Sequence, residues 1–526
     1  MAASPGMSRN VRRAALLIAL GFLVMRLPSM LDRYDIDDES LYTVVTTEWL
    51  EGGRLYIDTF ERRPPLLFVA YAAVLSLAGY YNIHAVHVVA ALWTLLTMGG
   101  LFVAGRRLFD DRAGLVAAAL YGVYSGFGRY SNLAWNGELL LNLPLVWGIV
   151  LTFRTTTSRF RPELLLAGAL LGCAFLFKQP AAAAAVALGI YLLLPSYRRQ
   201  RQATVWQSLI AAALFTLGFA AVVGTAVWLL YANGLLTDAL YWVFRHHDMP
   251  HGPTDVIFWE RLEVAGVWFI LCCFPLLAAA AASLGSRRRW WSWPGRDAER
   301  TTLIGLLVMA MLGVCASGRF YMHYFMLLLP ALSLAAAPVV TALLAGEVKP
   351  GVEGLWPLNP RSMRRVLIAT TAIFFVLHGV AAVRHQKGNQ AARFIKEHSL
   401  PTDRIFVWGE LPRVYQESQR HPSSRYICTY PLTGHPYGGA ISYDPVYPDT
   451  SGRIVPGAWD ILERELAARP PRYIVDVEAK LRLPRYPIEK FPRFARFLEQ
   501  HYRRVRDAGD AVIYERLPPG AAATTG

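Results

Sequence analysis

Long apolar runs alternate with short polar segments along most of this chain, which predicts helices that cross a membrane. A membrane-spanning helix needs about 20 mainly apolar residues and satisfies its own backbone hydrogen bonds. We expect about eleven spans, at residues 14–31, 83–104, 113–129, 138–153, 163–177, 180–194, 203–231, 262–284, 301–316, 323–345 and 365–383. One further run, 66–79, is short for a span and is predicted to lie as a helix at the membrane interface.

Composition supports this prediction. Hydrophobic residues make up 54% of the 526 residues and charged residues only 17%, whereas soluble domains carry about 25% charged residues. These values exclude a disordered, fibrous or nucleic-acid-binding chain and make a single soluble domain a poor description. The sequence therefore predicts a polytopic α-helical membrane protein with the lipid bilayer, and no nucleic acid, as a partner.

The net charge of +15 comes largely from arginine clusters between the apolar runs. With residues 66–79 at the interface, 21 Lys and Arg residues fall on the face that holds the N-terminus and nine fall in short loops on the other face. Positive loops stay in the cytoplasm. The N-terminus is therefore predicted to be cytoplasmic, in a multi-pass inner (plasma) membrane protein, and an odd number of spans places the tail outside.

The tail differs in composition from the rest of the chain. Strand-like segments occur at 404–409, 424–430, 471–477 and 510–517, and amphipathic helix patterns occur at 389–398 and 458–469. We expect two domains: a transmembrane domain at 1–383, and an extracytoplasmic α/β domain at 384–526.

The first external loop, 32–82, carries the most informative polar residues. An acidic cluster follows the first span and leads into an amphipathic helix, and the loop then closes on acidic and basic residues before two prolines. Helix capping and interfacial solvation are the ordinary explanation for such carboxylates. Carboxylates and guanidiniums together at a membrane surface also suit a base beside a lipid phosphate. The residues concerned are Asp35, Asp37, Asp38, Glu39, Glu61, Arg62 and Arg63.

Other candidates lie at the predicted outer helix ends. Glu138 begins a span, where a second acid and a carboxylate stabilised by the helix dipole are both reasonable. Lys178 separates two short spans and is either functional or a snorkelling side chain. A third group, with a phosphate role for its arginine, comprises Arg319, Tyr321, His323 and Tyr324. His246, His247 and His251 resemble a metal site only loosely, so no metal ligands are assigned.

Several segments resemble the GT-C glycosyltransferases, in the bacterial branch related to protein O-mannosyltransferases and the lipid A aminoarabinose transferase. The first-loop segment DDESLYTVVTTEWLEGGRLYIDTFERRPPLLFV carries the most specific likeness. Weaker likenesses, in the expected order, are WNGELLLNLPLVW at 135–147, FLFKQPA at 175–181 and GRFYMHYFMLLLPAL at 318–332. The resemblance covers most of the chain and implies a GT-C-like fold.

The resemblance also implies roles for the first-loop residues. The family's Asp-Glu-x-x-Tyr motif falls on Asp38, Glu39 and Tyr42, which makes Asp38 the catalytic base or the group that positions the acceptor. Asp37 is the alternative, because the acidic run allows a slip of one residue. The family's basic residue before the proline pair falls on Arg63, with Arg62 as the alternative.

The function implied by this resemblance is hexosyl or pentosyl transfer, with inversion, from a polyprenyl-phosphate-linked monosaccharide to an extracytoplasmic protein, lipid or glycan. No cofactor is assigned, and a divalent metal has no support in the sequence. A transporter or flippase of a lipid-linked or anionic substrate is the rival class, since it would also contain intramembrane cations and broken helices. A ligase or polymerase of lipid-linked glycans, which differs in donor size, remains a third hypothesis.

The distribution of basic residues generates a testable topology. We expect a reporter enzyme that works only outside the cytoplasm to be active when it is fused after Arg384. A cytoplasmic reporter at the same position is expected to be inactive. The reverse pattern would overturn the number of spans and the predicted side of the first loop.

Overall fold

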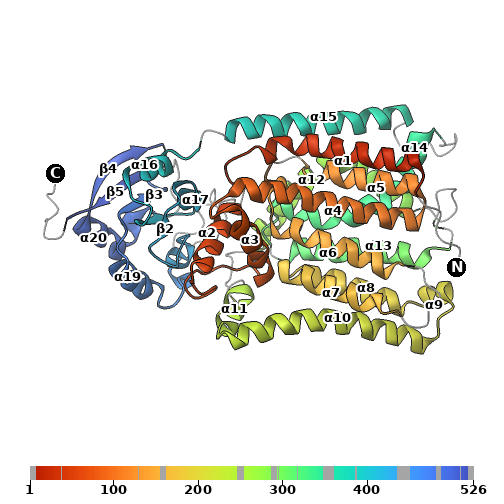
Figure 1. The fold of residues 1–526 in the computed structure, drawn as a ribbon, viewed down its shortest axis with the longest axis horizontal. Helices are drawn as coiled ribbons and strands as arrows, with labels where there is room; N and C mark the ends of the chain where they lie inside the picture. Colours follow the sequence, from red (N-terminus) through yellow and green to blue (C-terminus); the bar gives the residue numbers. More distant parts are fainter. Residues whose placement is uncertain are drawn as a thin grey trace.

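We describe the protein from a computed structural model. The structure describes residues 7–36, 38–127, 130–154, 161–245, 254–285, 293, 295–316, 318–346, 360–385, 388–434, 450–480, 487–509 and 511–518. A bundle of long helices forms one part and a small α/β domain caps one end of it (Figure 1).

Every predicted span coincides with a helix. The helices that match the predicted spans are α1 (Arg9–Met30), α4 (Ile83–Leu108), α5 (Asp111–Tyr124), α6 (Gly137–Thr152), α7 (Glu163–Phe177), α8 (Ala181–Leu193), α10 (Val205–Ala232), α12 (Thr254–Gly285), α13 (Asp297–Cys315), α14 (Leu329–Ala345) and α15 (Pro360–His385). A 3-10 helix, η3 (Met322–Leu328), leads directly into α14. The predicted polytopic helical fold is therefore confirmed.

Seven of these helical segments are long and apolar enough to cross a membrane by length and composition. The number becomes eight if α8 and the short α9 (Pro195–Arg201), which are bent by 56° to each other, form one span. Helices α6 and α7 are apolar but shorter. The number of eleven spans thus stays a prediction, because short helices inside a bundle can be tilted or covered by their neighbours.

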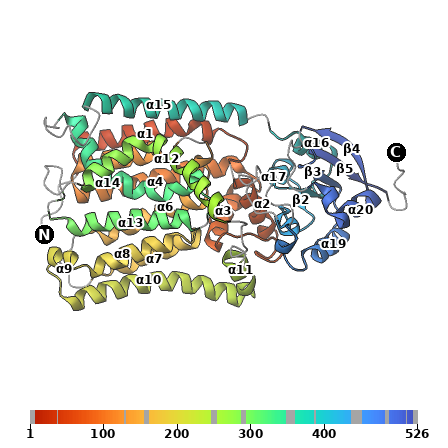
Figure 2. The ribbon, with the colours of Figure 1, turned by 180° about the vertical axis from the view of Figure 1, so that it is seen from behind.

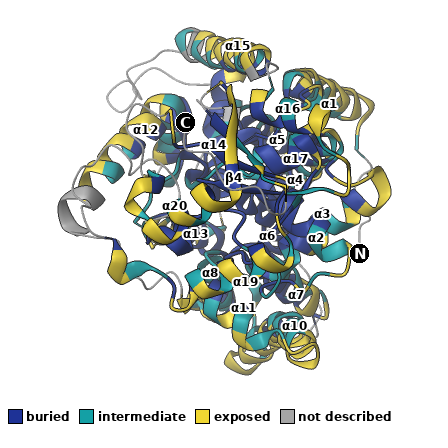
Figure 3. Ribbon diagram, turned by 90° about the vertical axis from the view of Figure 1, so that its left-hand side faces the viewer, coloured by how far each residue is buried: buried dark blue, intermediate teal, exposed yellow. Residues whose placement is uncertain are grey.

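Burial separates the helices into an inner and an outer group. In the apolar window of Met322–Ala345, 83% of residues are buried, against 17% in the corresponding windows of α1, α10 and α15. Figure 3 shows the exposed residues on these outer helices and the buried ones towards the middle of the bundle. Large exposed apolar side chains such as Leu217 and Trp228 on α10 are what a helix facing lipid requires.

Two short helices lie where the bundle meets the α/β domain. They are α2 (Glu39–Leu50) and α3 (Pro65–Ala78), and both views place them at the end of the bundle opposite the N-terminus and α9 (Figure 1, Figure 2). The helix α11 (Leu236–Val243) lies at this same end. Helix α3 corresponds to the apolar run predicted at the interface, and its 14 residues explain why it does not extend along the bundle.

The C-terminal part contains a five-stranded sheet in the order β2-β1-β3-β5-β4. Strand β1 pairs in parallel with β2 and β3, and β5 is antiparallel to β3 and β4. The strands are β1 (Arg404–Trp408), β2 (His421–Pro422), β3 (Tyr473–Asp476), β4 (Tyr502–Ala508) and β5 (Ala511–Arg516). The longer helices around the sheet are α16 (Gln390–His398), α17 (Arg413–Ser418), α19 (Ala458–Ala468) and α20 (Pro492–His501). Cys428, which is buried, is the one cysteine of the sequence between 384 and 526.

Three of the four predicted strands are confirmed and the strand at 424–430 is wrong. That segment is buried, but its backbone bonds do not form a ladder: the Arg425 amide donates to the Glu465 carboxylate and the Thr429 amide donates to the Gly409 carbonyl. Its apolar pattern therefore reflects burial alone. Strand β4 was not predicted from the sequence. It is an edge strand whose inner five residues are all exposed, so it lacks the alternation of apolar and polar residues expected of a half-buried strand.

Candidate active site

Asp38 stands at the first turn of α2. Its carbonyl accepts the Tyr42 amide (3.2 Å), which starts the helix, but its carboxylate does not cap the free amides of this turn. Instead the Tyr42 hydroxyl and the Arg63 guanidinium both donate to Asp38 Oδ2, at 3.1 Å and 2.9 Å. The carboxylate is thus turned towards the loop that closes on the proline pair, which disfavours the capping explanation.

Arg63 completes a closed triad with these two residues. Its Nε donates to the Tyr42 hydroxyl at 2.9 Å, while its carbonyl accepts the Tyr56 hydroxyl at 2.8 Å. Pro64 and Pro65 follow, and a proline at the first helical position is well suited to begin α3. The local sequence therefore fixes Arg63 immediately before a helix, with its side chain directed at α2.

Burial sets the charge states in this triad. It raises the pKa of Tyr42 well above its ordinary value, so the phenol stays protonated and can donate to Asp38. Burial opposes the charge on Arg63, but the neighbouring Tyr42, Glu61 and Asp38 outweigh it and raise the pKa of Arg63 well above its ordinary value. Arg63 is therefore a permanent cation beside the carboxylate.

Glu39 points the opposite way and is fully buried. Its Oε2 accepts the Ile36 amide (2.9 Å) and faces His87 Nε2 (2.8 Å), and its Oε1 accepts the Trp135 amide (2.7 Å). The other ring nitrogen of His87 lies 3.1 Å from the Asp32 carbonyl. Glu39 thus ties the start of α2 to α4 and to the segment before α6, and does not face the triad.

Glu61 and Arg62 link the first loop to the C-terminal domain. Glu61 Oε1 accepts the Arg62 amide at 2.7 Å and lies 3.9 Å from Arg63 Nη1. Burial raises the pKa of Glu61, against the opposing effect of Arg63 and Arg62. The Arg62 guanidinium lies 5.3 Å from the ring centre of Tyr430, a residue of the short helix α18 (Tyr430–Thr433). That contact is a cation–π interaction between the two domains.

Arg319 lies in the loop between α13 and η3 and is the electrostatic neighbour of Arg62. Burial lowers the pKa of Arg319, and the charge of Arg62 lowers it further. Arg62 is buried and Arg319 is half-buried, and two neighbouring guanidiniums that are partly removed from water favour an anion beside them. Tyr321 at the end of this loop and two residues of η3 pack on one another, with ring centres 5.6 Å apart for Tyr321 and His323 and 5.0 Å apart for His323 and Tyr324.

Glu138 and Lys178 form a buried ion pair next to the triad. Lys178 Nζ donates to Glu138 Oε1, and it lies 4.1 Å from the ring centre of Tyr324. His323 Nε2 is 4.0 Å from the same Glu138 oxygen. Arg63 is an electrostatic neighbour of both Glu138 and Tyr324. The pair and the triad therefore belong to one polar site at the start of α2, the start of α6 and the end of α7.

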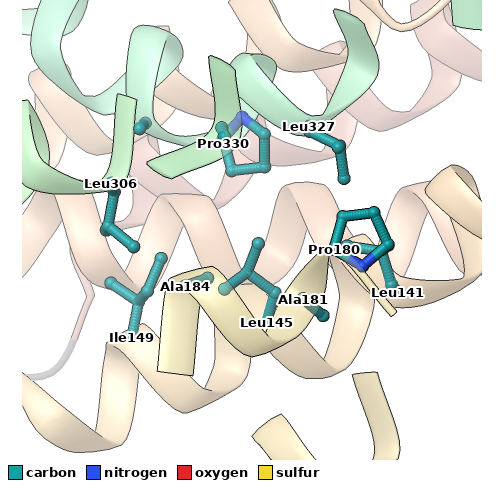
Figure 4. Close-up of a pocket in the computed structure, with 11 residues that line it drawn as sticks. Leu141, Leu145, Ile149, Pro180, Ala181, Ala184, Leu306, Leu327 and Pro330 are labelled. Atoms are coloured by element: carbon teal, nitrogen blue, oxygen red, sulfur yellow. The ribbon is translucent and has the colours of Figure 1, made fainter. Parts of the chain in front are cut away.

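An apolar pocket lies between the helices of the bundle. Its lining side chains come from α6, α8, α13, η3 and α14 and face a common space (Figure 4). Three of them lie close to site residues in sequence. Leu141 comes three positions after Glu138, Pro180 two positions after Lys178 and Leu327 four positions after His323. The full lining is Leu141, Leu145, Ile149, Pro180, Ala181, Ala184, Leu306, Ala310, Leu327, Pro330 and Ala331.

The structure brings most of the predicted site residues together. Asp38, Tyr42, Glu61, Arg62 and Arg63 meet in the first loop, and they adjoin a second group made of Glu138, Lys178, Arg319, Tyr321, His323 and Tyr324. Two first-loop carboxylates lie apart from these groups: Glu39 serves the interior and Asp35 pairs with Arg413 of α17. Asp37 and the three histidines 246, 247 and 251 lie outside the described residues.

Sequence reasoning missed Tyr430 and Phe60. The Phe60 ring lies between Trp242 of α11, at 4.8 Å, and Tyr430, at 5.4 Å. Phe60 stands one position before the acidic and basic residues of the loop, and this proximity was the only local signal for it. Tyr430 had no such signal, because it reaches the site through the docking of a distant domain.

Comparison with known proteins gives a partial family match. Residues 62–228 match the family described as dolichyl-phosphate-mannose-protein mannosyltransferase. The matched region begins at Arg62 and contains Arg63, Glu138 and Lys178, and Asp38 lies before it. No curated protein matches the sequence of the chain.

Solved structures match over nearly the whole chain. ArnT from Cupriavidus metallidurans bound to undecaprenyl phosphate is 14% identical, with a TM-score of 0.63, and the match covers 96% of this chain and 98% of ArnT. The oligosaccharyltransferase AglB from Archaeoglobus fulgidus, in complex with an inhibitory peptide and a dolichol-phosphate, is 14% identical with a TM-score of 0.51, over 97% and 75% of the two chains. The chain has the GT-C fold.

The GT-C fold confirms the resemblance seen in the sequence motifs. It accounts for a helical bundle with a short helix pair at one end and a C-terminal domain above that pair. At this level of identity the comparison concerns the fold, and the roles of individual residues rest on the geometry described above. Donor and acceptor stay predictions at this point.

The contacts of Glu39 predict that it is needed for folding. Replacing Glu39 with Ala leaves the Ile36 and Trp135 amides and His87 without their shared acceptor, and breaking a buried charged pair costs about 3–5 kcal/mol. We expect a marked fall in the thermal unfolding midpoint of the purified protein. Asp58→Ala, at a first-loop carboxylate paired with the exposed Arg54, is the matched control and is expected to unfold near the wild-type temperature. Equal stability of the two variants would contradict this role of Glu39.

Proposed function

We propose that the protein is an integral-membrane glycosyltransferase that moves a monosaccharide from a polyprenyl-phosphate donor to an extracytoplasmic acceptor. The observation that carries this proposal is the Asp38–Arg63–Tyr42 triad, which stands beside further buried cations and above an apolar pocket. Such a transfer needs a carboxylate base for the acceptor, a cation for the leaving phosphate and an apolar cavity for the lipid chain, all at one site.

In the proposed reaction Asp38 takes the proton of an acceptor hydroxyl. The hydroxyl oxygen then forms a bond to the anomeric carbon of the donor sugar, and the bond from that carbon to the lipid phosphate oxygen breaks. The electron pair of that bond leaves with the polyprenyl phosphate. Because this is one direct displacement, the configuration at the anomeric carbon is inverted. Tyr42 and Arg63 hold the carboxylate oxygen that they contact, which orients the base before the acceptor arrives.

The leaving phosphate requires cations that are already in position. Arg62 is buried, Arg319 is half-buried and feels the charge of Arg62, and Lys178 Nζ lies over the ring of Tyr324. In such a site fixed charges stabilise a developing anion more strongly than they would in water. We therefore assign the phosphate to Arg62 and Arg319, and we assign Arg63 chiefly to Asp38, its nearest carboxylate.

The pocket below the cations suits the lipid part of the donor. All eleven lining residues are apolar, and the side chains labelled in Figure 4 converge on one space between α6, α8 and α14. Because the isoprenoid chain is already surrounded by hydrocarbon in the bilayer, such a pocket competes with lipid through packing. The lining residues Pro180 and Leu327 come two and four positions after Lys178 and His323, which supports a lipid site close to the proposed phosphate site.

A transporter or flippase of a lipid-linked or anionic substrate is the rival function. It would use the same cations and pocket but would break no bond of the donor. The base in the triad is the feature that favours the enzyme, since translocation has no need of a carboxylate aimed at an acceptor. Release of free polyprenyl phosphate, measured beside movement of the intact donor in proteoliposomes, separates the two functions.

The triad predicts that Asp38 is essential for transfer. Asp38→Asn keeps the shape of the side chain but removes its basicity, so transfer of a labelled sugar from a polyprenyl-phosphate donor should fall by at least about 10²-fold. Donor binding to the same purified variant should stay near wild type, because cations and apolar surface hold the donor. Asp37→Asn is the comparison, and it should keep a larger share of the activity. An active Asp38→Asn enzyme would remove the proposed mechanism, and a dead Asp37→Asn beside it would move the base by one residue.

The paired arginines predict a loss in donor use. Arg319→Ala and Arg62→Ala should each lower the transfer rate by about 10²–10³-fold, since each removes a preorganised contact to the leaving group. Lys at either position should restore part of the rate, because it keeps the charge but loses the guanidinium fork. Arg54→Ala is the matched control: Arg54 lies in the same loop but is exposed and paired with Asp58. Equal rates for the Arg319→Ala, Arg62→Ala and Arg54→Ala variants would show that the phosphate lies elsewhere.

A further inference from the structure

The C-terminal domain holds α2 from both of its ends. Before α2 begins, the Arg413 guanidinium of α17 lies 3.3 Å from Asp35 Oδ1 and 5.0 Å from the ring centre of Tyr34. At the other end of α2, His421 of β2 contacts the carboxylates of Glu48, in the last turn of the helix, and of Glu51, which follows it. The helix that begins at Asp38 is therefore clasped by a domain that supplies none of the proposed acid–base residues.

His421 stands between two carboxylates. Its Nδ1 lies 2.5 Å from Glu48 Oε1 and its Nε2 lies 3.3 Å from Glu51 Oε2. An ionised carboxylate only accepts hydrogen bonds, and a neutral imidazole carries one N–H, so a neutral ring satisfies one of these contacts. The imidazolium, with two N–H groups, satisfies both. The geometry thus selects the protonated ring.

The other groups around His421 include one cation, Arg404, which opposes the imidazolium charge but is itself paired with Glu48. Arg404 Nη1 of β1 lies 3.6 Å from Glu48 Oε2, and the Tyr81 hydroxyl lies 3.5 Å from His421 Nδ1. Arg420, the adjacent residue, directs its guanidinium to the Ser399 and Lys396 carbonyls. Two carboxylates of α2 therefore face the Arg404 cation and the histidine. The hydrogen bond to Glu48 raises the pKa of His421, and partial burial opposes it.

We propose that protonated His421 is a positioning residue that holds α2, and with it Asp38, in the geometry needed for transfer. Glu48 and Asp38 are ten residues apart on one rigid helix, a separation of about 15 Å along its axis. A constraint at the Glu48 end is thus transmitted to Asp38 without any contact between His421 and the substrate. This inference rests on the proposed function for its effect on catalysis, but not for its effect on α2.

The proposal fixes the direction of the pH dependence. Because the contacts of the folded protein favour the protonated ring, the stabilisation is present at low pH and is lost as the pH rises through the pKa of folded His421. The base Asp38 has the opposite requirement, since it must be ionised to accept a proton. Loss of activity at high pH therefore indicates deprotonation of His421 and loss of its contacts with Glu48 and Glu51. Loss of activity at low pH indicates protonation of Asp38.

The test measures α2 and the transfer rate separately, with full-length protein in detergent or nanodiscs. Hydrogen exchange of the α2 amides and sugar transfer are followed at about pH 7 and about pH 9, with exchange corrected for its intrinsic pH dependence. The variants are His421→Gln, which cannot carry the charge, and His421→Arg, which keeps the charge at both pH values. His501→Gln, at an exposed histidine of α20, is the matched control.

We expect wild type to show about three- to tenfold faster α2 exchange and slower transfer at the higher pH, in proportion to the loss of a partly buried ion pair. His421→Gln should show the faster exchange at both pH values, with unchanged protection of β3, and His421→Arg should show neither change with pH. Equal α2 exchange at both pH values in wild type, with no change in His421→Gln, would overturn the proposal. Loss of α2 protection on addition of EDTA at neutral pH would also overturn it, because a bound cation would then join Glu48, Glu51 and His421. The expected exchange changes without any transfer by wild type would overturn the proposed function and leave the clasp standing.

Discussion

A single buried carboxylate determines where the proposed catalytic groups lie. Glu39 is enclosed by protein, and its two oxygens are shared among the Ile36 amide, the Trp135 amide and His87. A charge in such a place is tolerated only with complete hydrogen bonding, so α2 can begin in one orientation and no other. With Glu39 turned inward, its neighbour Asp38 is directed about 100° away, towards Arg63 and the open side of the site.

The same balance of burial against charge recurs through the site. Asp38 has Arg63, Glu138 has Lys178, and Arg62 has the face of Tyr430. Each contact joins segments that are far apart in the sequence, so the outer ends of several helices are held as one unit. In the proposed reaction the lipid carrier would approach through the apolar bundle, and the acceptor would approach from the side of the C-terminal domain.

Sequence patterns predicted the parts of this structure that depend on local physics. Apolar length located every long helix, and the spacing Asp38 to Tyr42 predicted two side chains on one face, which the hydrogen bond between them confirms. The spacing could not separate Arg62 from Arg63, because adjacent arginines look alike until their partners, Tyr430 and Asp38, are in place. Nor could it assign Glu39 to the interior, since its partner His87 is 48 residues away.

Cys428 has a consequence for how the cell makes this protein. As the sole cysteine of residues 384–526, it has no second thiol in that region with which to form a disulfide, and its side chain is enclosed by the protein core. The cap over the bundle must therefore acquire its shape from packing alone, through contacts such as the stacked rings of Trp408 and Phe494. Its maturation needs no thiol oxidase or disulfide isomerase for a bond within that domain, so the domain can fold in a reducing or an oxidising compartment.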